Sequence, residues 1–194
     1  MEDVKEFSPS DSLKLITSMI RQTKESVVDN SFYFLFWGWL SFAACIGQFV
    51  LAEFVKYPHA YYVWFLMPVG GIITGIYQRR HERTMQVRTV LSDSISHLWA
   101  GIGLLFIAIF FINIKIGWDY AFVQYILLYA TGTFITGRIM KFSPLVWGGI
   151  SNFVIAFFAA DHNMTYQSLF AGLALLLSYI IPGHMLKAQF KKRN

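Results

Sequence analysis

The chain has 194 residues, of which 56% are hydrophobic and 14% are charged, and its formal net charge is +5. A soluble domain is about a quarter charged, and here every Asp, Glu, Lys and Arg falls outside six long apolar stretches, which excludes an ordinary soluble domain. The basic residues flank these stretches, so the positive charge is a topology signal and gives no reason to expect nucleic-acid binding.

The six stretches predict an all-α, polytopic membrane protein with six transmembrane helices, since a helical span needs about 20 mostly apolar residues. In chain order they cover residues 31–52, 61–77, 95–114, 120–137, 144–160 and 166–185, the second and fifth being short. Barrel strands would alternate polar and apolar residues, whereas residues 104–112 are apolar on every face. We expect a transmembrane domain at 31–186, preceded by a segment at 1–30 and followed by a basic tail at 187–194.

The segment before the first span is predicted to be an amphipathic helix on the cytoplasmic side. Within residues 11–29, apolar residues recur at helical spacing and basic residues lie elsewhere on the wheel. The favoured interpretation is a helix on the inner membrane surface, and the alternative is a docking helix for a cytoplasmic protein partner. The first residues are polar and show no cleaved signal peptide, so we expect the first span to remain as its own insertion signal.

The distribution of basic residues predicts the orientation. Fourteen Lys and Arg residues lie before the first span, after the last, or in the second-to-third and fourth-to-fifth loops, and the opposite loops hold only Lys56 and Lys115. Cytoplasmic loops carry the excess of basic residues, so both termini are expected on the cytoplasmic side of the membrane. The single cysteine, Cys45, lies within the first span and excludes an intramolecular disulfide.

Two short patterns recur along the chain and predict an internal repeat. Each odd span has a Trp followed by a small residue near its cytoplasmic end, and each even span ends in a Gly that basic residues follow. The Trp residues are Trp37, Trp99 and Trp147, and the Gly residues are Gly75, Gly137 and Gly183. Both patterns shift by 62 residues between the first two copies, and by 48 and 46 residues to the third. We therefore expect three tandem helical hairpins in a pseudo-threefold arrangement, although membrane interfaces alone enrich Trp.

The spans contain no ionisable acid or base other than histidine, tyrosine and the cysteine, which argues against a proton-driven pump or a voltage sensor. The neutral residues proposed to line a ligand site or path are Asn152, Thr74, Thr136, Trp37, Trp99 and Trp147. The structural alternative for the polar residues is that they hydrogen-bond between helices or to the helix backbone. For the tryptophans it is anchoring at the membrane interface or packing between helices.

No catalytic residues, metal ligands or cofactors are assigned. The sequence lacks a P-loop, a dinucleotide fingerprint, a nucleophile elbow and an HExxH pair, and its five histidines show no i, i+4 spacing. An enzyme of lipid metabolism is therefore the least favoured class.

Residues 11–16, with Phe36, Trp37, Gly38 and Trp39, resemble the start of a group of small, uncharacterised bacterial six-span membrane proteins. The resemblance implies a six-span fold in a bacterial inner membrane, and because the group has no assigned activity it implies nothing about mechanism. The function favoured is a non-enzymatic membrane protein that contacts membrane lipids and acts through a partner, or senses a lipid or small apolar ligand. The alternative is a small transporter or channel that passes a neutral solute between the three hairpins, and homo-oligomerisation is left open.

Overall fold

The computed structural model describes residues 32–82 and 90–191, which form α-helices, short turns and no strand. The amphipathic helix expected within residues 11–29 lies outside the described residues, as does the end of the basic tail. The all-α prediction is confirmed for the described part of the chain.

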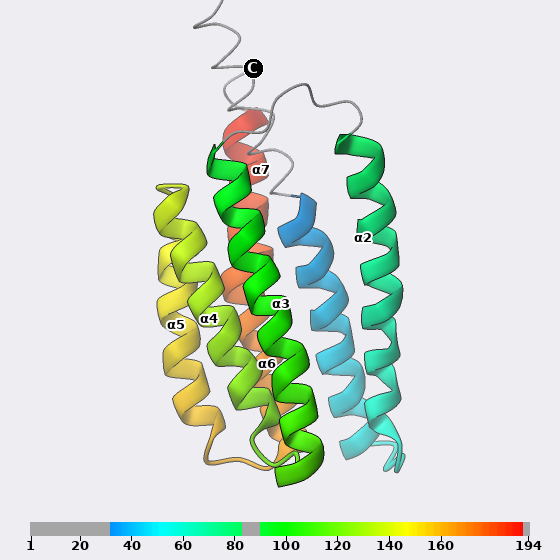
Figure 1. The fold of residues 1–194 in the computed structure, drawn as a ribbon. Helices are drawn as coiled ribbons and strands as arrows, with labels where there is room; N and C mark the ends of the chain where they lie inside the picture. The colour runs from blue at the N-terminus through cyan, green and yellow to red at the C-terminus, as the bar shows by residue number, and fades with distance from the viewer. Residues whose placement is uncertain (1–31, 83–89, 192–194) are drawn as a thin grey trace, which may run out of the picture.

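Six helices run up and down side by side (Figure 1). The first helix is Phe32–Glu53, and a 3-10 turn, η1 (Ala60–Phe65), leads into α2 (Leu66–Glu82). They are followed by α3 (Val90–Ile116), α4 (Ala121–Ile139) and α5 (Ser143–Ala159). The sixth helix is continuous through α6 (Met164–Leu175), the π-helical turn η2 (Leu176–Ile180) and α7 (Ile181–Lys191).

Four helical stretches in the described ranges are long and apolar enough to cross a membrane: Phe32–Glu53, Ala60–Tyr77, Asp93–Ile116 and Met164–Ala188. They coincide with the first, second, third and sixth expected spans. The fifth expected span corresponds to α5, which is apolar but has 17 residues. The fourth corresponds to α4, which has 19 residues and includes Arg138, Gln124 and several threonines.

Local sequence signals explain several helix ends. Pro144 occupies the first turn of α5, where its missing N–H costs no hydrogen bond. Asn163 caps α6, its side-chain oxygen accepting from the Tyr166 backbone N–H at 3.2 Å. In the sixth helix Pro182 lacks an N–H, and just before it the Ile181 N–H donates to Leu176 O five residues back. A proline that removes a regular bond accounts for the π-helical turn at this position.

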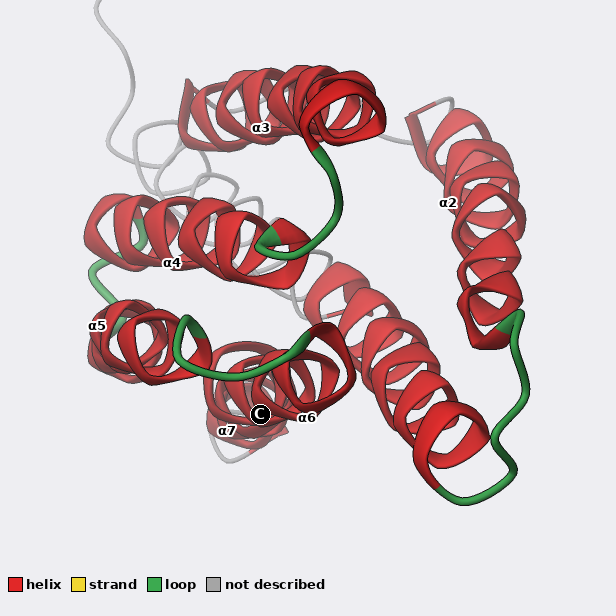
Figure 2. Ribbon diagram, turned by 90° about the horizontal axis from the view of Figure 1, so that it is seen from below, coloured by secondary structure: helices red, strands yellow, loops and turns green. Residues whose placement is uncertain are grey.

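Burial is uneven across the bundle. In the apolar stretch of the sixth helix 56% of the residues are buried, whereas in those of α2 and α3 the shares are 17% and 11%. Viewed along the helices, α4, α5 and α6 cluster closely, while α2 stands at the periphery (Figure 2). Large apolar side chains cover the outside of α3, including Leu104 at 70% exposed. An apolar exterior of this kind suits hydrocarbon as the surrounding solvent.

The first helix packs on α2 in the same way as α3 packs on α4, and we call each of these antiparallel pairs a hairpin. A Cβ added at Gly70 would meet Leu40 and the Trp37 ring, and one at Gly132 would meet Ile102 and the Trp99 ring. Every residue of the first set is 62 positions before its counterpart in the second. The offset inferred from Trp and Gly in the sequence thus also relates the residues that touch inside each hairpin.

Candidate functional site

Asn152 is fully buried between α5 and the sixth helix. In the amide orientation that satisfies both of its polar atoms, Nδ2 donates to Ala174 O at 3.1 Å and Gly148 O at 3.3 Å. Its Oδ1 lies 3.0 Å from the Ser178 hydroxyl, whose one proton is shared with Ala174 O at 2.7 Å. The amide therefore ties two helices together and has no free polar atom to offer a ligand.

The two threonines proposed for a path are satisfied within their own helices. The Thr74 hydroxyl donates to Gly70 O at 2.9 Å, and the Thr136 hydroxyl donates to Gly132 O at 2.7 Å. Both side chains are buried, but α2 and α4 lie apart, so the two hydroxyls do not share a site (Figure 2). A hydroxyl bonded to a carbonyl one turn earlier is a common way to bury Thr in an apolar helix.

The three tryptophans have different surroundings. Trp37 lies against Gly70 of α2, and Trp99 lies against Gly132 of α4 with its ring 6.0 Å from that of Tyr179. Trp147 is 68% exposed on the outside of α5. Trp37 and Trp99 thus pack inside their hairpins, and Trp147 points away from the bundle.

Sequence reasoning missed a buried polar group, the Tyr179 hydroxyl in the π-helical turn. Its ring contacts those of Phe34 on the first helix, Trp99 on α3 and Tyr129 on α4. The Tyr179 hydroxyl lies close to the fully buried Thr133 hydroxyl, and neither has another hydrogen-bond partner within the described part of the chain. The spacing of Tyr179 did not single it out, because the sequence does not reveal a π-helical turn.

At the opposite end of the bundle, hydrogen bonds from side chains join neighbouring helices and a loop. Trp64 Nε1 donates to Gln48 Oε1 within the first hairpin, and Asn113 Nδ2 donates to Gln124 Oε1 at 2.9 Å within the second. Gln167 Nε2 on α6 donates to Asp119 O at 2.6 Å, joining the third hairpin to the loop of the second. These buried amides, like Asn152, hold helices together.

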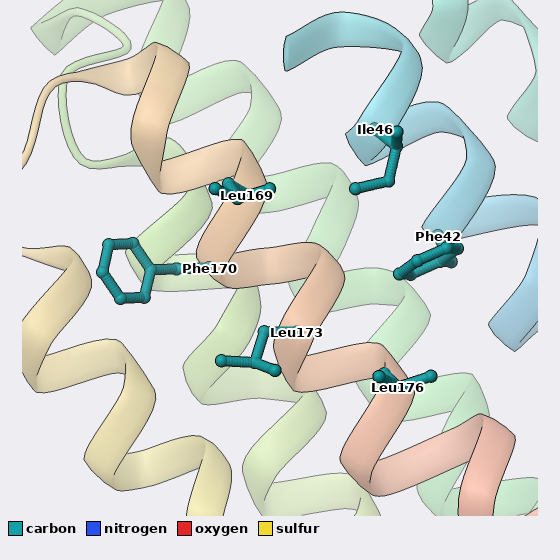
Figure 3. Close-up of a pocket in the computed structure, with 6 residues that line it drawn as sticks. All are labelled: Phe42, Ile46, Leu169, Phe170, Leu173 and Leu176. Atoms are coloured by element: carbon teal, nitrogen blue, oxygen red, sulfur yellow. The ribbon is translucent and has the colours of Figure 1, made fainter. Parts of the chain in front are cut away.

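An apolar groove lies between the first helix and the sixth. It has a volume of about 290 Å³ and opens to the side of the bundle. Figure 3 shows the side chains that line it: Phe42, Ile46, Leu169, Phe170, Leu173 and Leu176. None of the six residues predicted to line a ligand site is among them. A usable signal was present, because Phe42 and Ile46 on one helix, and Leu169, Leu173 and Leu176 on the other, recur at helical spacing.

The described residues hold no group of three His, Cys, Asp or Glu side chains that could bind a metal. Nδ1 of His97 lies 2.7 Å from Asp93 O of its own helix, and Nδ1 of His162, in the turn after α5, lies 3.0 Å from Phe158 O near the end of α5.

Comparison with known proteins identifies no relative: no family model, curated protein or solved structure matches the chain.

Proposed function

We propose that the chain crosses the membrane six times as three tandem hairpins and binds one acyl chain of a membrane lipid in the apolar groove, without catalysing a reaction. The hairpins are the first helix with α2, α3 with α4, and α5 with the sixth helix. The antiparallel arrangement of all six helices and the four long apolar stretches support the six-span topology (Figure 1). The repeated packing at Gly70 and Gly132 supports the hairpin repeat.

The ends of the bundle support an orientation with both termini in the cytoplasm. One end of the bundle carries basic residues from the last turns of α2 and α4, from the turn after α4, and from α7: Arg79, Arg80, Arg138, Lys141 and Lys187. At the other end the described basic residues are Lys56 and Lys115, and Lys56 pairs with Glu53 at 3.4 Å. The end with the basic excess faces the cytoplasm under the positive-inside rule.

The position and chemistry of the groove favour an acyl chain. Phe42 and Ile46 lie midway along the first helix, and Leu169, Leu173 and Leu176 lie in the apolar stretch of the sixth. The groove is therefore expected at the depth of the lipid hydrocarbon, where a polar solute would have to shed its water. All six lining side chains are apolar, so they offer dispersion contacts and no hydrogen bond.

The internal bonds of Asn152, Thr74 and Thr136 favour lipid binding over transport. The polar side-chain atoms of these three residues already bond to the protein. One observation favours the transport alternative: where the three hairpins meet, the buried Tyr179 and Thr133 hydroxyls have only each other as neighbouring polar groups among the described residues. If the alternative holds, vesicles containing the protein will pass a neutral solute and the Tyr179→Phe variant will change that flux.

Photolabelling tests the proposed groove. The protein in vesicles is irradiated with a phospholipid that carries a diazirine on its acyl chain, and labelled peptides are mapped by mass spectrometry. We expect labels to concentrate on the groove, and Leu173→Trp, which fills it, to lower that labelling several-fold. Leu104→Trp is the matched control, because Leu104 is an exposed residue on α3, outside the groove. Labelling spread evenly over the exposed helices, or unchanged by Leu173→Trp, would contradict a specific acyl-chain site.

A further inference from the structure

The three hairpins meet at interfaces that the repeat makes comparable. By the offsets found in the sequence, Gly75, Gly137 and Gly183 are equivalent on the even helices, as are Leu35, His97 and Leu145 on the odd helices. If the arrangement is threefold, each of these glycines should meet the odd helix of the next hairpin at an equivalent residue.

Two of the three interfaces obey this rule. Between the second and third hairpins, a Cβ added at Gly137 would lie 2.9 Å from Leu145 Cβ and 2.7 Å from Val146 N. Between the third and first, a Cβ at Gly183 would lie 3.0 Å from Leu35 Cδ2. Leu145 and Leu35 are equivalent residues, so the two interfaces use the same contact.

A second contact on the same interfaces agrees to within one residue. A Cβ at Gly149 of α5 would lie 2.7 Å from Phe134 N, and one at Gly38 of the first helix would lie 3.2 Å from Ile180 Cγ1. Phe134 and Ile180 are equivalent by the 46-residue offset, and Gly38 is one position from the counterpart of Gly149. Both pairs bring a glycine of an odd helix onto the preceding even helix.

The third interface, between the first and second hairpins, has residues at the equivalent positions but is open. The equivalent pairs there are Gly75 with His97 and Ile72 with Gly101, joining α2 to α3. A Cβ at Gly75 or Gly101 would meet no atom of the described residues within 4 Å, and Ile72 is 63% exposed. Figure 2 shows α2 and α3 standing apart on this side of the bundle.

We infer that α2 and α3 close onto each other, bringing Gly75 to His97 and Gly101 to Ile72, and that the structure shows the open state of this lateral gate. We infer that α3 covers the open face of α2, and α2 that of α3, because in the two packed interfaces the equivalent residues are covered by the neighbouring helix of the same chain. The inference rests on the three-hairpin architecture proposed above and is independent of the acyl-chain site.

Disulfide trapping tests the closure. The background is the full chain with Cys45→Ala, which removes the only native cysteine. We expect the pair Ile72→Cys and Gly101→Cys to form an intrachain disulfide in vesicles under mild oxidation. The matched control replaces Gly101→Cys with Gly103→Cys, because Gly103 is equally open but lies about 200° further round the helix. The control pair should cross-link several-fold less, and adding Gly75→Leu to the first pair should suppress the cross-link.

The other outcomes decide against the proposal. An interchain disulfide would show that a second copy covers α2, and equal cross-linking of the control would show unspecific motion. If the first pair does not accumulate, Gly75→Cys with His97→Cys makes the same test. Leu35→Cys with Gly183→Cys should cross-link across a packed interface. If this control pair cross-links and both α2–α3 pairs fail, the gate is wrong and the three-hairpin architecture stands. If all three pairs fail, both the gate and the architecture are rejected.

Discussion

At the scale of single residues, neutral polar side chains serve as connections between or within helices. Asn152 has two partners across the interface of α5 with the sixth helix, Ala174 O and the Ser178 hydroxyl, and a third, Gly148 O, in its own helix. Ser151, next to it, donates at 2.8 Å to Gly148 O of its own helix. Asn152 therefore links two helices, whereas the Ser151 hydroxyl bonds within its own helix.

Replacing Asn152 with Ala should lower the free energy of unfolding by about 1 kcal/mol, a typical value for hydrogen bonds between membrane helices. Ser151→Ala should cost little, because its hydroxyl bonds to a backbone already held by the helix. Unfolding in mixed micelles with increasing dodecyl sulfate measures both variants. Equal losses for the two would show that Asn152 adds nothing across the interface.

At the scale of helices, glycines differ according to whether a neighbouring helix lies against them. A Cβ at Gly137 would come within 3.0 Å of α5 backbone atoms, which cannot move away as a flexible side chain can. A Cβ at Gly75, its equivalent in the first hairpin, would meet no atom within 4 Å among the residues that the structure describes. The same residue type in the same repeat position therefore predicts opposite effects of substitution.

Gly137→Ala should destabilise the protein by about 1–3 kcal/mol, because the added methyl group forces α4 and α5 apart. Gly75→Ala should be neutral or slightly stabilising, since Ala favours the helix over Gly by up to about 1 kcal/mol. Thermal aggregation in mild detergent compares the two. A loss at Gly75 as large as that at Gly137 would mean that the open face is packed in the dominant state.

The helices themselves were predictable because hydrocarbon imposes length and apolarity on every span. The expected spans at 31–52 and 144–160 correspond closely to Phe32–Glu53 and Ser143–Ala159. The candidate site was less predictable. A sequence lists Asn152 and Thr136 as polar residues in apolar spans, but it does not show that their partners lie within the bundle. The groove escaped notice because it depends on which two apolar faces fail to fill the space between them.

At the scale of the whole molecule, orientation follows from the charges at the two ends of the bundle. In a Cys45→Ala background, a cysteine replacing Lys141 should react with an impermeant maleimide only when the cytoplasmic side is accessible. A cysteine replacing Asp161, which is exposed in the turn after α5, should react from the opposite side. Labelling of intact cells and inverted vesicles measures both. Reversed accessibility would overturn the assignment of the termini to the cytoplasm.

The unequal lengths of α3 and α5 have a consequence for the surrounding bilayer. With 27 and 17 residues, they extend roughly 40 Å and 26 Å at 1.5 Å per residue, on either side of a hydrocarbon core of about 30 Å. In the six-span topology proposed above, lipid beside α5 would thin, while α3 would tilt or project beyond the core. In that topology, the total mismatch of α3 and α5 is smallest at an intermediate membrane thickness. Its stability in vesicles of increasing acyl length should pass through a maximum, and a flat response would argue against this mismatch.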